Sequence, residues 1–476
     1  MLILSREVGE SVVIDGRIIV KVMRLEGGVL KLGIEAPPEI PVHRQEVYEE
    51  IQKSNREAMV RPSGSVPKLS KNGAASAARD KERADRSKGR LIIVQGGFPC
   101  LSETFILDQI TGFIDRGWNI EDWAAYDSKE PTQHEAIREY DLLKKTKYLR
   151  FPDRSLASDT DRWVKTFCEQ NSPGSLENVA AFHVHFGPNF NKLAPLFRFL
   201  KTFVVVSFHG YDASSVFQQQ GDSCYAYLFE RANLITTPTQ RMKDELVRRG
   251  CPSEKVRIHR CGVDLSKFTP PVRKQPNEKP TVLTVARLVE KKGIEYSLRA
   301  FAEFKNRVAA EYRIIGDGPL RASLEELARH LGIHDRVSFL GTGRKQDVQR
   351  EMARADVFVL SSVTASDGNQ EGLPVSLIEA QAMGLPVVST HHAGIPELVV
   401  DGVTGFLVRE KDVAGLARNL EKLLSDARLR QQFSVNARER VCREFDIDRL
   451  NDKLTDVFLA ATAPMNTGGS PREQER

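Results

Sequence analysis

Residues 361–390 read SSVTASDGNQEGLPVSLIEAQAMGLPVVST, and this stretch decides the fold of the larger part of the chain. The apolar run before it predicts a strand that ends at Ser361 and Ser362. A glycine-containing loop follows, and Pro374 precedes a segment with helical spacing. PVVST then predicts the next strand. An apolar strand followed by a loop, a helix and another apolar strand is typical of a parallel sheet covered by helices.

The same alternation extends outward over residues 90–463. Continuous apolar strands alternate with amphipathic helices, which indicates parallel sheets that are buried on both faces. Pro270 and Pro271 interrupt the alternation. We therefore expect two doubly wound, Rossmann-like α/β domains with a cleft between them. The expected strands are RLIIVQGG, VAAFHVHFG, TFVVVSFHG, NLITTP and KVRIHRCGVD before the prolines, and TVLTVARL, YRIIGDG, RVSFLG, DVFVLSS, PVVST and TGFLV after them.

Residues 1–58 have a different pattern. Five short β-like runs precede a segment with helical spacing, so the sequence predicts a small all-β module with a C-terminal helix. Asp15-Gly16-Arg17 is a good hairpin turn, and Gly27-Gly28 separates the next two runs. Five strands in so short a segment bury only a small core, and a module of this size usually needs a partner copy.

Net charge divides the chain as well. It is −2 over residues 1–58, +6 over residues 59–90 and +1 over the remainder. The basic segment is rich in Ser, Ala and Gly and almost free of large apolar residues, so it predicts a flexible linker. The expected organisation is a small module at 1–58, a basic flexible linker at 59–89, a first α/β domain at 90–271, a second α/β domain with closing helices at 272–463, and a disordered tail at 464–476.

Composition argues against several classes of protein. The six cysteines are scattered without a CxxC pair, which excludes a disulfide scaffold or a cysteine-rich zinc site and fits a reducing cytoplasm. No apolar run approaches the roughly 18 residues that a membrane span needs. No basic segment leads into an apolar stretch at the N-terminus, so we expect no secretory signal and a cytoplasmic location.

Two carboxylates lie within the deciding stretch. Glu371 is in the loop at the carboxyl end of a strand, and Glu379 lies eight positions further on, inside the expected helix. A helix N-terminus presents free N–H groups and the positive end of a dipole, which suit phosphate. Carboxylates only accept hydrogen bonds, so one can reach a sugar hydroxyl and the other a ribose diol.

Cations and glycines follow three other expected strands. Arg287 and Lys292 lie just past TVLTV, where two cations can neutralise a diphosphate and stabilise it as a leaving group. Gly316 and Gly318 follow YRII, where the backbone can approach a ligand closely. Gly97 follows RLIIVQ in the first domain, at the turn that usually faces an anion.

His209 directly follows the expected strand TFVVVSF and faces the same expected cleft.

Each of the glycines, carboxylates and cations singled out above also has an ordinary structural explanation. A glycine pair can be a tight turn, a single glutamate can complement a helix dipole, and a single arginine can belong to a surface ion pair. Their joint occurrence at strand carboxyl ends, in one order along the chain, favours a ligand site.

This ordered set resembles the family 4 retaining glycosyltransferases of GT-B architecture. The resemblance covers the chain from about residue 90 to 463 and rests on Arg287 and Lys292, on GDGP, and on EGLPVSLIEAQAMGLPVV with its Glu-x7-Glu pair. FPCLSETFI, HVHFG and FHGYD resemble the exopolysaccharide and colanic-acid-type branch of the family.

The resemblance implies that a nucleotide-sugar donor binds the second domain, with Gly316 and Gly318 of that domain and Gly97 of the first domain among the donor-binding residues. Arg287 and Lys292 would hold the diphosphate, Glu379 would accept from the ribose, and Glu371 would contact the donor sugar. His209 would reach across the cleft to the sugar. It implies retaining hexosyl transfer to a saccharide or lipid-linked acceptor that the first domain would bind, with transient contact at a membrane surface and without a nucleophilic carboxylate.

No cofactor and no metal is expected. Asp446 and Asp448 in FDID resemble the metal-binding DxD of the other glycosyltransferase architecture, but they fall between two expected helices, which favours a helix cap. His183 and His185 share one face of a strand and could be mistaken for a zinc pair. No third ligand is evident in the sequence, and zinc needs one.

MLILSREVGESVVID, KLGIEAP and VHRQEVYEEIQ in the first module resemble the CsrA translational regulators. The resemblance implies an interlocked homodimer that binds GGA-containing hairpin loops in mRNA leaders and represses translation initiation or alters mRNA stability. Members often carry a second basic residue where this chain has Glu7, which weakens the electrostatic attraction to RNA. The positions that match RNA contacts are Leu4, Arg6, Val42, His43 and Arg44.

The sequence thus favours a bifunctional chain, an RNA-binding module tethered to a sugar transferase. In the alternative interpretation, the module serves only to pair two transferases. A third hypothesis holds that the two parts exist as separate proteins in the cell, in which case lysate would lack a 53.4 kDa species that carries both.

Overall fold

The computed structural model describes residues 10–14, 18–26, 29–35, 89–129, 134–156, 159–174, 176, 178–271 and 279–462. The chain forms two compact units, residues 1–83 and 84–476. Within the described ranges, no helix is both long enough and apolar enough to cross a lipid bilayer.

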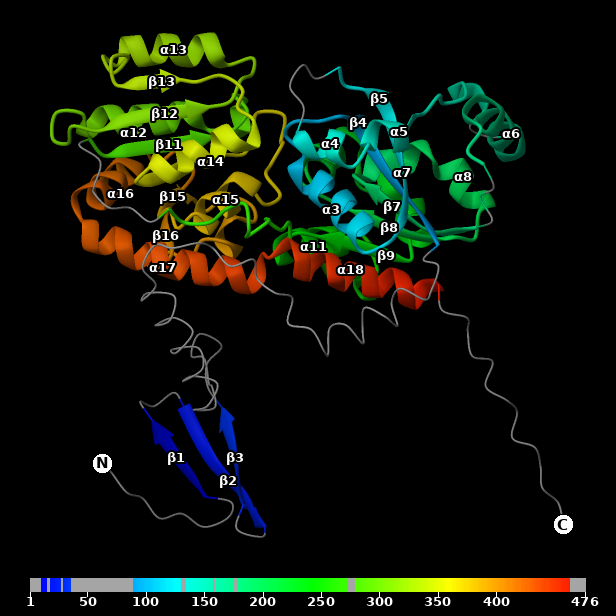
Figure 1. Ribbon diagram of the computed structural model, residues 1–476, viewed down its shortest axis with the longest axis horizontal. Coiled ribbons are helices and arrows are strands. Elements are labelled where there is room, and N and C mark those ends of the chain that lie inside the picture. Colours follow the sequence, from blue (N-terminus) through cyan, green and yellow to red (C-terminus); the bar gives the residue numbers. More distant parts are fainter. Residues whose placement is uncertain are drawn as a thin grey trace. The chain divides into compact units, whose positions relative to one another are not determined.

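The first unit contains an antiparallel sheet in the order β1-β2-β3 (Figure 1, blue). Its strands are β1 (Ser11–Ile14), β2 (Ile18–Glu26) and β3 (Val29–Glu35). Ile14 pairs with Ile18, and Glu26 with Val29, so the expected hairpins are confirmed. The two other expected strands and the expected helix lie outside the described residues. Four large apolar side chains of this sheet are exposed, Val13, Ile19, Met23 and Ile34.

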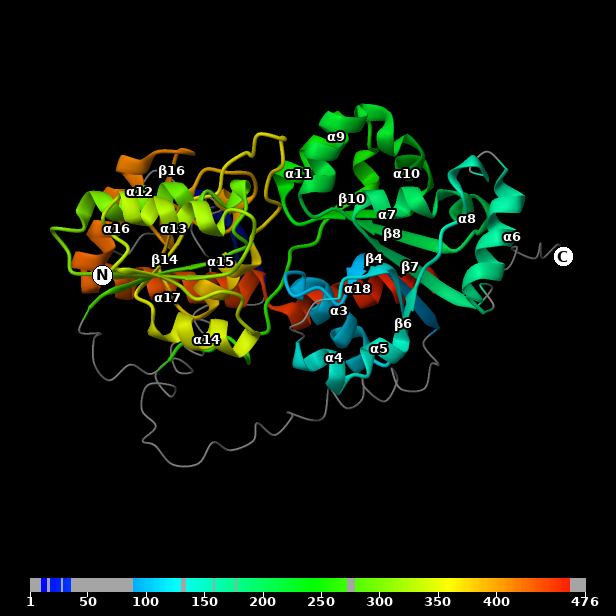
Figure 2. The ribbon, with the colours of Figure 1, turned by 90° about the horizontal axis from the view of Figure 1, so that it is seen from above.

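The second unit has two lobes, each built on a parallel sheet (Figures 1 and 2). The first-lobe sheet has the order β10-β9-β8-β7-β4-β5-β6. Its strands are β4 (Arg90–Phe98), β5 (Asn119–Asp127), β6 (Thr146–Tyr148), β7 (Val179–His185), β8 (Phe203–Ser207), β9 (Leu234–Thr237) and β10 (Val256–Ile258).

Helices cover both faces of this sheet. One face packs against α6, α7, α8, α10 and α11, and the other against α3, α4, α5 and α18. The helices of this lobe are α3 (Thr104–Asp115), α4 (Glu135–Glu139), α5 (Leu142–Lys145), α6 (Thr160–Asn171), α7 (Gly187–Lys192), α8 (Ala194–Phe199), α9 (Ser215–Gln220), α10 (Ala226–Arg231) and α11 (Gln240–Arg248), with 3-10 turns η1 (Arg154–Leu156), η2 (Tyr211–Ala213), η3 (Asp222–Tyr225) and η4 (Ser253–Lys255).

The second-lobe sheet has the order β13-β12-β11-β14-β15-β16. Its strands are β11 (Thr281–Val285), β12 (Glu311–Ile315), β13 (Val337–Phe339), β14 (Val357–Leu360), β15 (Val387–Thr390) and β16 (Gly405–Val408). Figure 2 shows α12 and α14 on opposite faces of this sheet, in line with two separate apolar cores. The helices are α12 (Ile294–Phe304), α13 (Arg321–His330), α14 (Lys345–Arg354), α15 (Val375–Ala382), α16 (Val413–Ser425) and α17 (Ala427–Glu444), with 3-10 turns η5 (Glu290–Lys292) and η6 (Ile395–Glu397).

The sheets confirm two doubly wound α/β domains, but sequence analysis missed β5 and β6. β5 reads NIEDWAAYD and carries three acidic residues, so it lacks a continuous apolar run. Asp122 in this strand is buried and accepts hydrogen bonds from Gln95 Nε2 at 2.7 Å and Thr146 Oγ1 at 2.9 Å. These bonds satisfy a polar group that would otherwise be costly to bury, because an unpaired buried carboxylate loses its hydration.

The chain crosses between the lobes twice. It leaves the first lobe after β10, and it returns when α18 (Ile447–Thr462) packs on the first lobe (Figure 1, red). Arg116 Nε lies 2.9 Å from Asp452 Oδ1, and the Phe458 ring lies 5.6 Å from that of Phe113. The two crossings are hydrogen-bonded to each other at Val263, whose N–H donates to the carbonyl of Phe445 at 2.8 Å.

Burial raises the pKa of Asp122 to about 7, although the bonds from Gln95 and Thr146 act to lower it. A carboxyl whose pKa is raised by folding binds its proton more tightly in the folded state, so its contribution to stability is lost as pH rises from about 4 to 7. We expect Asp122→Asn, which removes this titration, to gain thermal stability relative to the wild type as pH rises from 5 to 8.

Differential scanning fluorimetry across this range measures the effect. Asp127→Asn removes an exposed carboxyl from the same strand and is the matched control. A difference between Asp122→Asn and the wild type that stays constant with pH would contradict the prediction.

Candidate active site

A cavity of about 580 Å³ lies between the two lobes of the second unit. Its walls come from the loops that follow the strands of both sheets, which is where doubly wound proteins bind ligands. The lining includes residues 101–105, Phe186 and 209–211 of the first lobe, and residues 285–287, 291–292, 315–317, 369, 371–376 and Glu379 of the second.

A buried ion pair lies on the second-lobe side of the cavity. Lys292 Nζ lies 2.7 Å from Glu371 Oε1, and both side chains are largely buried. Burial alone would raise the pKa of Glu371, but the charges of Lys292 and Lys291 outweigh it and hold the pKa at about 2. Glu371 is therefore ionised at neutral pH and can only accept hydrogen bonds.

The loop that carries Glu371 is also held by hydrogen bonds to His392 and Glu410. The Glu371 N–H donates to His392 Nε2 at 3.1 Å, so the proton on this ring must sit on Nδ1, 2.6 Å from Glu410 Oε1. Glu410 also accepts from the Thr364 N–H at 3.0 Å. Lys291 Nζ donates to Asn369 Oδ1 at 3.1 Å. Contacts at both ends thus hold the loop in one conformation.

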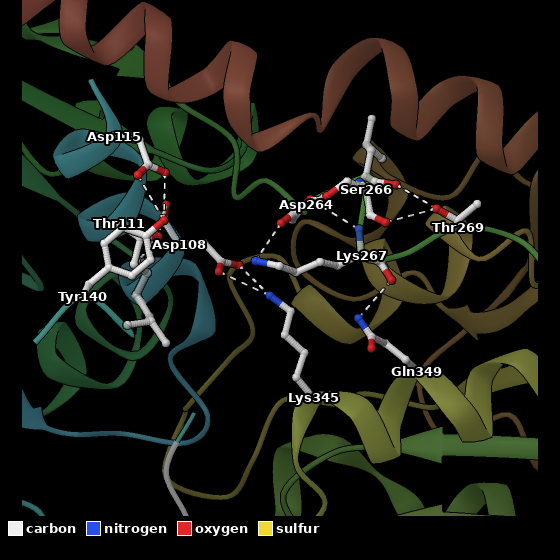
Figure 3. Close-up of polar contacts among 12 residues, drawn as sticks. Asp108, Thr111, Asp115, Tyr140, Asp264, Ser266, Lys267, Thr269, Lys345 and Gln349 are labelled. Carbon is white, nitrogen blue, oxygen red and sulfur yellow. Dashed lines mark hydrogen bonds and ion pairs between the residues drawn. The ribbon is translucent and has the colours of Figure 1, made fainter. Parts of the chain in front are cut away.

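Glu379 lies on α15 and is buried at the cavity wall. Burial raises its pKa to about 7, while Lys345 acts to lower it and Asp108 to raise it. Lys345 Nζ lies 3.3 and 3.2 Å from the two carboxylate oxygens of Asp108 on α3, so this contact joins the lobes (Figure 3). Both residues are close enough to Glu379 to act on its pKa. None of the described side chains caps the first turn of α15. The Leu377 N–H donates to the Pro374 carbonyl at 3.1 Å, and the earlier N–H groups of this turn are open to a ligand.

Arg287 is an exposed cation on the second-lobe side of the cavity. Its side chain makes no hydrogen bond or ion pair with any residue that the structure describes, and it lines the cavity. The guanidinium faces Glu103 of the first lobe closely enough to act on the pKa of that carboxyl. This guanidinium and the start of α15 line the same cavity, and both suit a diphosphate.

The three glycines named by the sequence differ in their roles. Gly316 lines the cavity, and a Cβ there would fall 1.8 Å from the carbonyl oxygen of Ala286, at a φ of +139°. Gly318 is not among the lining residues, and a Cβ there would fall 2.6 Å from the oxygen of Leu288. Both glycines therefore let the β12 loop pack against the loop that carries Arg287.

The expected turn at Gly97 is wrong. Gly97 lies inside β4, which continues to Phe98, and it is not among the lining residues. A Cβ at this position would fall 2.5 Å from the ring of Tyr126 on the neighbouring strand. Gly97 is therefore part of the strand, packed beside the Tyr126 ring, and not part of a turn after it.

His209 lines the cavity at the carboxyl end of β8, as expected. Its Nε2 lies 3.0 Å from His185 Nδ1, and its buried Nδ1 has no partner among the described residues. Burial lowers its pKa to about 3, with His183 and His259 acting in the same direction. His209 is therefore neutral and can contribute a hydrogen bond but no charge.

His183 and His185 are both fully buried in β7. His183 Nε2 lies 2.8 Å from Ser207 Oγ, and the described residues contain no cluster of three or more His, Cys, Asp or Glu arranged to hold a metal. Asp446 accepts from the Asp448 N–H at 3.0 Å and precedes α18, in agreement with a helix cap.

Sequence reasoning missed several residues of the site. Lys291 is adjacent to Lys292 and could have been found from that position. Lys345, Glu103, His392 and Glu410 are isolated residues whose roles depend on contacts between distant segments. The predicted RNA contacts lie outside the described residues, and they are Leu4, Arg6, Val42, His43 and Arg44.

Comparison with known proteins identifies the regions. Residues 102–267 match the model of glycosyltransferase family 4, residues 267–440 match that of glycosyl transferases group 1, and residues 1–53 match that of the global regulator protein family. WcaL of Salmonella typhimurium, assigned to colanic acid biosynthesis, is 35% identical over 397 residues, with 76% of this chain and 97% of that protein covered.

The amylovoran biosynthesis glycosyltransferase AmsK of Erwinia amylovora is 34% identical over 395 residues, with 76% and 97% of the two chains covered. Among solved structures, Anabaena Alr3699/HepE in complex with UDP and glucose shares the fold. Its TM-score is 0.64 at 18% identity, and the match covers 78% of this chain and all of that chain.

Removing one partner of a buried ion pair such as Lys292 and Glu371 leaves the other charge uncompensated, which typically costs about 3–5 kcal/mol of folding free energy. We expect Lys292→Met to lower the free energy of unfolding by about 3 kcal/mol, because Lys291 compensates Glu371 in part. The double variant Lys292→Met/Glu371→Gln should recover most of the loss. Chemical denaturation of the three proteins measures both effects.

Lys279→Met is the matched control, because Lys279 forms an exposed pair with Glu311 at 3.9 Å. Exposed pairs contribute little, so this variant should unfold like the wild type. If the double variant were as unstable as Lys292→Met alone, charge compensation would not explain the pair.

Proposed function

The chain belongs to glycosyltransferase family 4, and we propose that it transfers a hexose from a nucleotide-sugar donor to an acceptor with retention of anomeric configuration. The observation that carries the proposal is the grouping of Arg287, the Lys292–Glu371 pair and Glu379 around the uncapped start of α15 in one cavity. Cations and free N–H groups suit a diphosphate, and the carboxylates suit hydroxyls.

The donor would bind with its diphosphate between Arg287 and the start of α15. Lys292 would share its ammonium between Glu371 and the phosphate next to the sugar. Glu379 would accept from the ribose hydroxyls, and ionised Glu371 would accept from hydroxyls of the sugar. A structure of the same fold holds UDP and glucose, which supports a donor of this class.

In the proposed reaction, an acceptor hydroxyl attacks the anomeric carbon on the face that the diphosphate leaves. The bond from this carbon to the phosphate oxygen breaks, its electron pair stays on that oxygen, and the same oxygen takes the acceptor proton. Arg287 and Lys292 stabilise the charge that develops on the diphosphate. Glu371 serves to orient the sugar and is not a nucleophile, and neutral His209 offers a hydrogen bond from the first lobe.

We propose a lipid-linked or free saccharide acceptor in the cytoplasm, with transient contact at a membrane surface. Two relatives are named for colanic acid and amylovoran biosynthesis, which supports an acceptor that belongs to an exopolysaccharide.

Turnover of the nucleotide-sugar donor should depend on the charged side chains of Arg287 and Glu371. We expect Arg287→Ala and Glu371→Gln to reduce nucleotide-sugar turnover at least about 100-fold, since each removes a charge that orients or stabilises the reacting group. The assay is release of nucleoside diphosphate from UDP-glucose, UDP-galactose, UDP-N-acetylglucosamine and GDP-mannose.

Arg299→Ala is the control for Arg287→Ala, because Arg299 is an exposed arginine of the same lobe that does not line the cavity. It should turn over donor like the wild type. Wild-type turnover in both site variants, each shown to be folded by thermal unfolding, would contradict the assigned roles.

We also propose that the first module is a homodimeric RNA-binding unit that recognises GGA-containing hairpin loops in mRNA leaders and represses translation or alters mRNA stability. The match of residues 1–53 supports it. Four exposed apolar side chains on its described strands support a partner copy, because so small a sheet buries little surface alone. In the alternative, the module pairs two transferases without binding RNA.

Fluorescence anisotropy with a GGA hairpin and with a loop-mutated hairpin distinguishes an RNA-binding module from one that only pairs two transferases. We expect the full chain to prefer the GGA loop, and Arg44→Ala to weaken binding at least about tenfold because it removes a charged contact to RNA. Arg56→Ala is the control, because Arg56 belongs to the same module but is not one of the expected RNA contacts.

Light scattering on the same samples gives the oligomeric state. A dimer that ignores the loop sequence would favour the alternative. A monomer would contradict both interpretations of the module.

A further inference from the structure

Two histidine rings are in contact in the first lobe, one at the end of β7 and one just past the end of β8. His185 Nδ1 lies 3.0 Å from His209 Nε2, and the two ring planes are inclined by only 23°. The lone pair of an imidazole nitrogen lies in the plane of its ring, so nearly coplanar rings with facing nitrogens can form an N–H···N hydrogen bond. His209 borders the cavity, whereas His185 is fully buried and is not among the lining residues.

The backbone fixes the distance between these rings. His185 pairs with Ser207 in the register of the two strands, and the buried carboxylate of Asp212 ties together the segments that follow them. Asp212 Oδ1 accepts from the His209 N–H at 3.0 Å, and its Oδ2 accepts from the Gly187 N–H at 3.2 Å. Both histidines are therefore held through the main chain before any ligand binds.

Packing restricts the rotation of the His209 ring. The Phe105 ring lies against it with 4.6 Å between ring centroids, and the Phe186 ring meets it at 4.7 Å. In this orientation the ring presents a nitrogen to His185. Turning the ring by half a turn would present a carbon instead and remove the hydrogen bond.

Only one proton can lie between the two facing nitrogens. Burial lowers the pKa of His185 well below its usual value and that of His209 to about 3, so both rings are neutral at physiological pH. A neutral imidazole carries one N–H and one bare nitrogen. If His185 donates, the other proton of the pair lies on His209 Nδ1. If His209 donates, the other proton lies on His185 Nε2.

The two outer nitrogens decide between these arrangements. Neither His185 Nε2 nor His209 Nδ1 has a hydrogen-bond partner among the residues that the structure describes. A buried N–H without a partner is rare in folded proteins, and such a group is explained best where a ligand can satisfy it. Because His209 borders the cavity and His185 does not, the outer N–H belongs on His209 and the bare nitrogen on His185.

We propose that His185 is a positioning residue for the transfer reaction, which donates its Nδ1–H to His209 and thereby fixes the His209 proton on Nδ1, as a donor for an oxygen of the bound sugar. This inference rests on the proposed glycosyl transfer. Glu371 can only accept hydrogen bonds, so a sugar hydroxyl that donates to it keeps lone pairs that need a donor. The His209 N–H supplies such a donor from the first lobe.

Solid-state NMR on the full-length chain with isotope-labelled histidine tests the proton positions, because protonated and bare imidazole nitrogens have well separated chemical shifts. The His209 signals are assigned by their loss in His209→Asn. We expect a protonated Nδ1 and a bare Nε2 on His209 in the wild type. In His185→Leu, which removes the donor, a signal for protonated Nε2 should appear. A wild type with the His209 proton on Nε2 would overturn the proposal.

Donor turnover provides the second readout. We expect His185→Leu to lower kcat about tenfold or more while the donor KM stays within about twofold, because the affected hydrogen bond acts on the reacting sugar. His185→Asn should recover most of the loss, since its amide nitrogen lies as many bonds from the backbone as Nδ1 and also donates. An unchanged kcat in His185→Leu, or no recovery in His185→Asn, would overturn the assignment.

His183→Leu is the matched control. His183 lies on the same face of β7, is equally buried, and has its Nε2 2.8 Å from Ser207 Oγ. This variant should lose thermal stability much as His185→Leu does, yet keep most of the wild-type kcat and the proton on His209 Nδ1. An equal fall of kcat in both leucine variants would indicate general loosening of the sheet and would contradict a positioning role.

Two further outcomes are covered by the same design. If His185→Leu does not fold, His185→Asn is compared with His185→Gln, whose amide nitrogen lies one bond further from the backbone and should not restore kcat. If the wild type turns over none of the nucleotide sugars, only the proposed function is contradicted, and the protonation state of His209 still decides the role of His185.

Discussion

The buried pair of Lys292 and Glu371 is the interaction on which the cavity depends. It joins the loop after β11 to the loop before α15, and so places the cations, the carboxylates and the start of the helix around one space. Because the pair is largely removed from water, each charge needs the other, and neither loop can move alone without exposing an unpaired charge. His392 and Glu410 add a second support behind the same loop.

The two walls of the cavity are held to different degrees. On the second-lobe side, Glu371 is paired and its loop is fixed through side chains before any ligand binds. On the first-lobe side, Glu103 and His209 each keep a buried atom that no described residue contacts with a hydrogen bond. The second-lobe wall is therefore organised by its own contacts, whereas the first-lobe wall keeps hydrogen-bonding atoms that a ligand could engage.

Sequence alone predicted most of the strands because buried parallel strands are continuous apolar runs, as VFVL of β14 and FVVVS of β8 illustrate. It missed β5 because Asp122 is satisfied by Gln95 and Thr146, which lie 27 and 24 positions away. It predicted that Glu371, Glu379, Arg287, Lys292 and His209 would lie near one another, and they line one cavity because strand carboxyl ends meet at one edge of a sheet. It could not find Glu103 or His392, since an orphaned oxygen and a ring behind a loop exist only after folding. Gly97 was misplaced because a glycine under an aromatic ring and a glycine in an anion turn look alike in sequence.

The double crossing between the lobes also sets the order in which the chain can be completed during synthesis. The first lobe has its whole sheet once β10 has left the ribosome, but the surface around Phe113 and Trp118 stays uncovered until Phe458 arrives with α18. The entire second lobe must be translated in between. Nascent chains would therefore expose these aromatic rings during that interval, and a fragment that ends at the prolines would lack the helix that covers them.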